Sequence, residues 1–204
     1  MVLAAAAFTA NAQLKFIPKV GISIANVALK SGSITITPDS KIGLQFGGAL
    51  EIGVSDMFSI QPELLFIQKG YKLEDKGVTE TRSLNYLEIP ILAKVQFGTD
   101  QIKFHVNAGP SLGIIISGAD KEEGGGKPTI SRDLTIGSTE NDDIQRTDFG
   151  LQFGGGITFS NFVLDLRYGL GLSNIANSPS GFDFTAKNRA IGITVGYVVA
   201  LGGK

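Results

Sequence analysis

Residues 162–174, FVLDLRYGLGLSN, alternate one by one between two chemical classes. One set of alternate positions is wholly apolar or aromatic, and the other mixes charges of both signs with glycine and serine. Successive side chains of a β-strand point to opposite faces, whereas a helix would spread both sets around its circumference. The stretch therefore predicts a strand with one apolar face and one face that carries ionised groups.

The same alternation recurs in seven other segments, which gives eight predicted strands in all. The other seven are 15–26, 41–54, 58–71, 84–97, 102–117, 147–159 and 187–201. Their connections are long at 27–40, 72–83, 118–146 and 175–186, and short at 55–57, 98–101 and 160–161. Links as short as these force antiparallel neighbours. Eight antiparallel strands joined in this way are expected to close into an up-and-down barrel, which leaves no exposed edge.

The charged positions within the predicted strands decide which face of the barrel lies outside. They share the non-apolar face, and they comprise four acids and four bases: Lys19, Glu51, Glu63, Glu88, Lys94, Lys103, Asp165 and Arg167. A hydrated exterior needs no such balance, whereas a narrow interior does, because an unpaired buried charge is costly. We therefore expect an ion-pair network in the lumen of an all-β, eight-stranded antiparallel up-and-down transmembrane β-barrel.

The apolar face should then touch lipid. On the opening strand this face consists of Leu164, Leu166, Tyr168, Leu170 and Leu172. Aromatic side chains also gather beside the short connections, at Phe58, Phe97, Phe104, Phe159 and Phe162. Outer-membrane barrels carry such a girdle at the membrane interface, with short turns in the periplasm and long loops outside. These five residues are the predicted periplasmic girdle.

Five segments resemble the PorT-like family of small outer-membrane β-barrels. They are ANAQ at the N-terminal end, LNYLEIPILAKVQF at 84–97, VNAGPSLG at 106–113, DFGLQFGGGITF at 148–159 and LDLRYGLGLSNI at 164–175. The resemblance covers nearly all of the chain after residue 12, and its motifs belong to the fold and carry no catalytic chemistry. It implies an outer-membrane location in a Gram-negative bacterium and a molecular role that is mostly unassigned, with some members implicated in protein secretion.

The first residues, MVLAAAAFTANAQ, resemble the end of a secretory signal. A short apolar stretch is followed by Ala10-Asn11-Ala12, which fits the small-x-small pattern of a cleavage site. We therefore expect residues 1–12 to be the C-terminal part of a signal peptide and residues 13–204 to form the barrel domain.

Little in the sequence indicates catalysis, a cofactor or a metal. The chain has no cysteine and a single histidine, His105, which excludes a thiolate zinc site and a multi-histidine site within one chain. His105 falls on the lumen face, so we add it to the expected network as a hydrogen-bonding residue. The run Gly124-Gly125-Gly126 lacks the context of a phosphate loop and is expected to be a flexible loop. The net charge of −1 gives no basic footprint for nucleic acid.

The leading hypothesis is a monomeric, plugged barrel that acts as a structural or interaction component of the bacterial envelope. Its expected partners are outer-membrane lipids and an envelope protein that binds the acidic loop 118–146. Three alternatives remain open: a narrow channel, a membrane enzyme that uses His105, and a soluble or envelope barrel that binds lipid or another ligand. A barrel of this size is expected to be filled by its own side chains.

Overall fold

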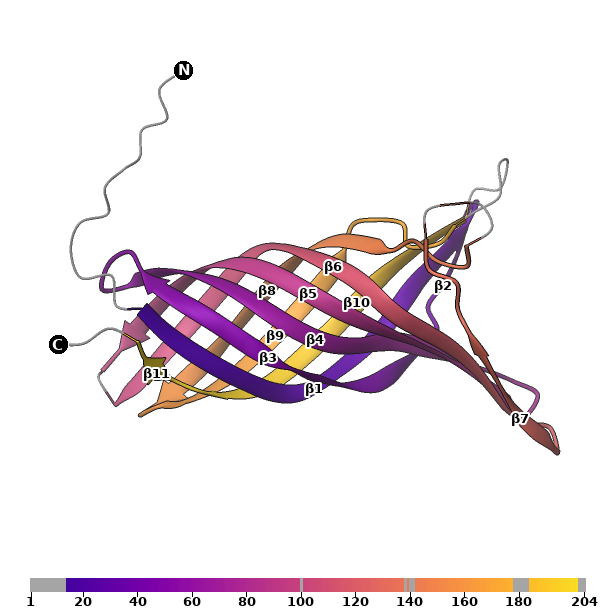
Figure 1. Cartoon of the computed structure of the whole chain (residues 1–204), viewed down its shortest axis with the longest axis horizontal. Coiled ribbons are helices and arrows are strands. Elements are labelled where there is room, and N and C mark those ends of the chain that lie inside the picture. Colours follow the sequence, from indigo (N-terminus) through magenta and orange to yellow (C-terminus); the bar gives the residue numbers. More distant parts are fainter. Residues whose placement is uncertain (1–13, 100, 138, 140–141, 178–183, 202–204) are drawn as a thin grey trace, which may run out of the picture.

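The computed structural model describes residues 14–99, 101–137, 139, 142–177 and 184–201, and the predicted signal segment 1–12 lies outside them. Eight long strands form a closed ring, which confirms the predicted antiparallel barrel (Figure 1). They are β1 (Leu14–Ser31), β3 (Asp39–Gly53), β4 (Phe58–Asp75), β5 (Val78–Gly98), β6 (Ile102–Gly124), β8 (Thr147–Phe159), β9 (Phe162–Gly171) and β10 (Phe184–Tyr197). Each pairs with its neighbour in the chain, and β10 closes the ring by pairing with β1. Within the described residues, no helix has the length and hydropathy to cross a membrane.

The two ends of the barrel differ. At one end, which we call the turn end, lie the short connections, together with the two ends of the described chain (Figure 1). One of these connections is the two-residue turn of Ser160 and Asn161, in which Ser160 has a φ of 54°. At the other end, which we call the loop end, the strands run on past the ring (Figure 1).

The connections predicted to be loops are largely strands. The segment 72–83 is a tight hairpin of β4 and β5, with positive φ at both Lys76 and Gly77, the geometry of a type I′ turn. The segment 118–146 begins with a second hairpin, formed by β6 and β7 (Lys127–Asp133), whose turn contains Gly125 and Gly126. The glycine run is therefore a tight turn, and its prediction as a flexible loop was wrong.

These two hairpins form a four-stranded sheet that projects from the loop end. We call this sheet, residues 71–83 and 118–133, the arm; it extends to the lower right of Figure 1. The prediction missed it because both of its faces carry polar and charged residues, so the apolar alternation stops while the backbone pairing continues. The segment 27–40 is likewise mostly paired, since β1 runs to Ser31 and β2 (Ile34–Ile36) folds back on it.

Other predicted boundaries also shift. β9 ends at Gly171, so Leu172 lies beyond it, and β10 begins at Phe184 inside the predicted loop 175–186. The predicted last strand is interrupted at Val198, after which β11 (Val199–Ala200) pairs with the start of β1. Val198 turns inward there and packs beside the apolar residues at the turn end of the lumen.

The apolar set of alternate residues points outward and the polar set points into the lumen, as the alternation predicts. Along β9, Leu164, Leu166 and Tyr168 point outward and are exposed, with Leu166 at 55%, while Leu170 is half-buried. The predicted girdle residues Phe58, Phe97, Phe104, Phe159 and Phe162 are all exposed and all lie next to the turns of the turn end. Two of them stack, with the ring centroids of Phe97 and Phe104 6.1 Å apart. Lipid contact by these residues stays a prediction.

Candidate functional site

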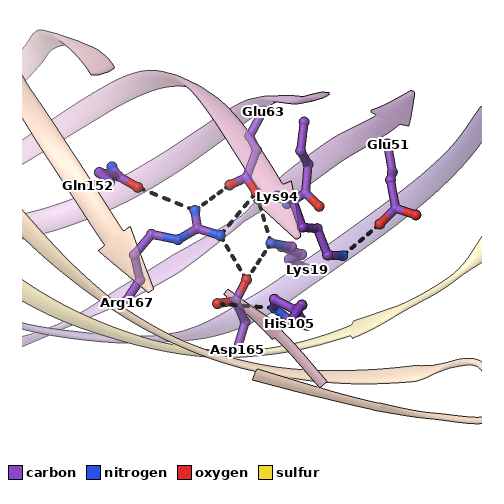
Figure 2. A network of polar contacts seen from close by, with 9 residues as sticks. Lys19, Glu51, Glu63, Lys94, His105, Gln152, Asp165 and Arg167 are labelled. Atoms are coloured by element: carbon purple, nitrogen blue, oxygen red, sulfur yellow. Dashed lines mark hydrogen bonds and ion pairs between the residues drawn. The ribbon is translucent and has the colours of Figure 1, made fainter. Parts of the chain in front are cut away.

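A continuous polar network fills the middle of the lumen (Figure 2). Lys19 of β1 donates to Glu63 of β4 at 2.9 Å and to Asp165 of β9 at 3.0 Å. Arg167, two residues along β9, donates to Glu63 at 2.7 and 3.2 Å and to Asp165 at 2.7 Å. Two cations and two carboxylates from three strands are thus held in one buried quartet, which joins β1, β4 and β9 across the barrel.

Gln152 of β8 extends the quartet toward the loop end. Its Oε1 accepts from Arg167 at 3.3 Å, and its Nε2 donates to Glu88 of β5. Glu88 also pairs with Lys69 of β4 at 2.5 Å, and the ammonium of Lys69 lies 4.6 Å from the ring centre of Tyr86. The lumen therefore holds an unbroken chain of contacts from Lys19 to Lys69.

A separate triad lies near the turn end. Glu51 of β3 accepts from Lys94 of β5 at 2.6 Å and from Lys15 of β1 at 2.8 Å. At the opposite end of the network, Asn188 of β10 donates to Asp148 of β8 at 2.8 Å and to the hydroxyl of Tyr86 at 2.7 Å. Polar contacts thus fill the lumen along most of its length.

The polar network of the lumen holds equal numbers of acids and bases, although not the predicted set, and the half-buried Lys41 on the inward face of β3 lies outside it. Five acids face five bases: Glu51, Glu63, Glu88, Asp148 and Asp165 against Lys15, Lys19, Lys69, Lys94 and Arg167. Lys103 was predicted to belong to the network, but it is only half-buried and has no ion pair within the described residues. Lys15, Lys69 and Asp148 were missed. Lys69 follows Leu65 and Ile67 on the inward face of β4, and these buried apolar residues obscured the alternation.

His105 lies beside the quartet, where its Nε2 is 3.9 Å from Asp165 Oδ1 and its Nδ1 has no hydrogen-bond partner. A distance of 3.9 Å is too long for a hydrogen bond. Across the described part of the chain, no group of three or more His, Cys, Asp or Glu side chains could hold a metal ion.

Apolar clusters lie at both ends of the lumen. At the turn end, Ile17, Ala49 and Val163 pack together against Val198. At the loop end, a larger cluster, which we call the plug, consists of Val27, Leu84, Tyr86, Ile115, Leu134, Ile144, Ile175 and Ala186. Between them, the lumen cavity lined by Lys19, Glu63 and Arg167 has a volume of about 40 Å³. This cavity has room for a few water molecules, and buried polar atoms without protein partners, such as those of Asn107, could bind them.

Two irregular segments, one with Leu134 and Ile144 and one with Ile175, complete the plug, whose other residues lie on β1, β5, β6 and β10. Ile144 forms bridges with Ile136 and with Ala176, and the backbone NH of Ile175 donates to Ala186 O at 2.9 Å. In the segment that contains Ile144, Asp143 accepts hydrogen bonds from the backbone NH and from the hydroxyl of Thr135, each at 2.9 Å. These bonds hold the segment in a compact conformation. The backbone hydrogen bond from Thr135 lowers the pKa of Asp143 from its usual range. Sequence reasoning missed the plug because its residues are scattered from Val27 to Ala186.

The inward face of the arm carries two rows of side chains in register. In the first row Tyr71, Arg82, Asp120 and Arg132 follow one another across four strands. Arg82 donates to both oxygens of Asp120 at 2.7 and 2.6 Å, and these hydrogen bonds raise the pKa of Arg82. In the second row Glu80 lies directly opposite Glu122, and neither has an ion-pair partner among the described residues. Both rows line a hollow of about 270 Å³.

Comparison with known proteins identifies the family. The family described as "Outer membrane protein beta-barrel domain" matches residues 9–177, most of the chain. None of the curated proteins matches the sequence.

The chain is similar to many solved structures, among them the following three. Ail, the attachment invasion locus protein of Yersinia pestis, is 14% identical with a TM-score of 0.47, covering 93% of this chain and 100% of its own. Neisserial surface protein A is 15% identical with a TM-score of 0.45, covering 89% and 96%. The outer membrane protein AlkL is 11% identical with a TM-score of 0.45, covering 100% and 98%. On the family match, the chain belongs to the outer membrane protein β-barrel family, and its barrel lies in the bacterial outer membrane.

Proposed function

We propose that this protein is a closed, monomeric barrel that acts as a structural and interaction component of the outer membrane. In such barrels the short turns face the periplasm and the long connections face the exterior. The turn end is then periplasmic, and the plug and the arm lie on the outside of the cell.

The filling of the lumen by its own side chains is the observation that carries this proposal. The paired side chains leave a lumen cavity of only about 40 Å³, and the plug at the loop end opposes the passage of ions. Moving an unpaired ion through such an interior is costly. A narrow channel is the weaker candidate for this reason.

An enzymatic role, like a channel, is less well supported than the structural and interaction role. His105 is only 3% exposed, so a substrate on either side of the membrane could reach it only through the filled lumen. A general base must lie within hydrogen-bond reach of the proton that it takes from the substrate. We therefore propose that His105 is a structural residue of the lumen and that the protein is not an enzyme.

The arm is the surface that we propose for a protein partner. It replaces the predicted interaction loop 118–146 with a sheet, whose unpaired Glu80 and Glu122 lie beside the exposed side chain of Ile130. Like charges placed directly opposite each other destabilise a sheet, and a basic partner would relieve this repulsion. The finer assignment to the PorT-like group, with a role related to secretion, also belongs to this proposal and is supported by the five sequence segments.

Site-specific crosslinking in cells tests the interaction. A photoreactive residue at Ile130 should yield a crosslinked adduct with a protein, and the variant that also carries Glu80→Lys and Glu122→Lys should lose it. The matched control is the same photoreactive residue at Leu164, which points outward within the membrane and should give no protein adduct. An absence of adducts at Ile130, or adducts equally strong at Leu164, would contradict an interaction through the arm.

A further inference from the structure

Three basic side chains stand on the outer surface of the barrel at the loop end. Along β10 the outward positions read Tyr197, Val195, Ile193 and Ile191, and then change abruptly to Arg189 and Lys187. On the adjacent strand β1, Lys30 also lies at an exposed position on the outward side. We call Lys30, Lys187 and Arg189 the basic patch.

The register of the two strands brings these cations together. Lys187 pairs with Ala28 and Arg189 with Asn26, while Lys30 lies two residues beyond Ala28 on the same face. Outward positions two apart on one strand, or diagonal across a pair, are separated by about 7–8 Å. A phosphate group can therefore be reached by two or three of these side chains at once.

The patch lies at the depth where the hydrocarbon ends. Arg189 and Lys187 are eight and ten residues from Tyr197, whose ring packs on the girdle residue Phe162 with centroids 5.2 Å apart. At about 3.3 Å per residue and a tilt of about 40°, these separations correspond to about 20 and 25 Å along the membrane normal. The apolar band of such barrels is about 25 Å tall. Lys187 therefore lies at the level of the outer-leaflet headgroups, and Lys30, which is opposite Thr185, lies just beyond it. Arg189 lies just below this level, and its long side chain can extend up to the headgroups.

The strands that carry the patch do not neutralise it, and Asp39 at the start of the adjoining β3 forms no ion pair with it among the described residues. β1, β2 and β10 contain no acidic residue. Asp165 of the neighbouring strand β9 points into the lumen, and none of the three cations has an ion-pair partner within the described ranges. This contrasts with the arm, where Lys121 pairs with Glu123 at 2.7 Å.

We propose that Lys30, Lys187 and Arg189 form a binding site for the phosphorylated headgroup of an outer-leaflet lipid. Arg189 would bind phosphate oxygens through its planar guanidinium, while the two lysines supply positive charge. The lipid's acyl chains would lie on Ile191 and Ile193 directly below. Depth, an apolar stripe below and uncompensated positive charge above distinguish this site from a general affinity for anions.

Native mass spectrometry of the detergent-solubilised protein tests the site, with diphosphorylated lipid A as the probe. The variant Lys30→Gln, Lys187→Gln, Arg189→Gln should bind it at least about tenfold more weakly than the wild type, because each basic residue near a membrane surface strengthens binding severalfold. The control variant Lys72→Gln, Lys76→Gln, Lys121→Gln removes three exposed cations from the arm and should bind as the wild type does. Heat-modifiable migration on gels checks that each barrel is folded.

Two further measurements distinguish a lipid site from a site for free phosphate. Lipid A without phosphates should bind the wild type as weakly as it binds the triple variant, and inorganic phosphate alone should not displace the intact lipid. If the triple variant fails to fold, the three single variants must each weaken binding. Equal binding by the wild type and the triple variant, equal binding of the dephosphorylated lipid, or displacement by inorganic phosphate would overturn the proposal.

Discussion

The substitution Glu63→Gln tests whether the lumen is an ion-paired interior of low dielectric constant. The Glu63 side chain is fully buried, and its oxygens accept from Lys19 at 2.9 Å, from Arg167 at 2.7 and 3.2 Å, and from Gln61 at 2.5 Å. Glutamine keeps the shape but removes the charge, so Lys19 and Arg167 would share Asp165 alone and the lumen would carry one uncompensated positive charge.

The loss in the free energy of unfolding should differ between a low-dielectric lumen and a hydrated lumen. Removing one partner of a buried pair costs about 3–5 kcal/mol, because the remaining charge stays buried without compensation. In a hydrated lumen, water would screen the same contacts, and the loss would be about 0–1 kcal/mol, as for exposed pairs. We expect the larger value, which is a substantial part of the about 5–15 kcal/mol that stabilises a typical folded protein.

Urea titration of the protein in lipid vesicles measures this free energy of unfolding. Far-UV circular dichroism is a suitable signal, because the chain has no tryptophan. The matched control is Glu122→Gln on the exposed arm, where no ion pair is lost and the change should stay within about 0.5 kcal/mol. Equal stabilities of Glu63→Gln and the wild type would refute the low-dielectric, ion-paired lumen.

Three further predictions concern the outward face, the revised network and the plug. Leu166→Arg places a charge near the middle of the apolar band and should cost about 2–4 kcal/mol, whereas Leu172→Arg at the loop end should cost about 0–1 kcal/mol, both measured by urea titration. Lys69→Gln should destabilise the barrel strongly by unpairing Glu88, and Lys103→Gln should have little effect; equal losses would contradict the revised network. Because the pKa of Asp143 is lowered on folding, its contribution is present above its ordinary value of 3.8 and is lost as the pH falls through the folded pKa. Acidification from pH 3.8 down through the lowered pKa should therefore make the backbone near Asp143 accessible to pepsin in the wild type. Asp143→Asn should be cleaved at acidic pH values at which the wild type still resists.

The sequence predicted the barrel well where one face of a strand is apolar and the other is polar. Along β9, Leu164 and Leu166 alternate with Asp165 and Arg167, so both the strand and its two faces could be read directly. In β4 the inward face also carries Leu65 and Ile67, which hid the position of Lys69. The period of two is visible only when the two environments differ.

The arm and the plug could not be predicted for different physical reasons. On the arm both faces are polar, so pairs such as Thr81 with Lys121 continue the sheet without any apolar period. The plug is built from residues as distant as Val27 and Ile175, which become neighbours only when the barrel closes. Charge balance predicted a paired lumen, but the identities of the partners depend on the register between strands, which no single segment encodes.

Planar-bilayer recording of the purified, heat-modifiable protein tests the closed barrel most directly. The plug, the balanced network and the apolar layer of Ile17, Ala49 and Val163 should together block ions. We expect the current at either polarity to equal that of the bilayer without protein. Reproducible current steps that increase in number with added protein, and change in size in the Glu63→Gln variant, would show that ions pass through the lumen and would contradict the closed barrel.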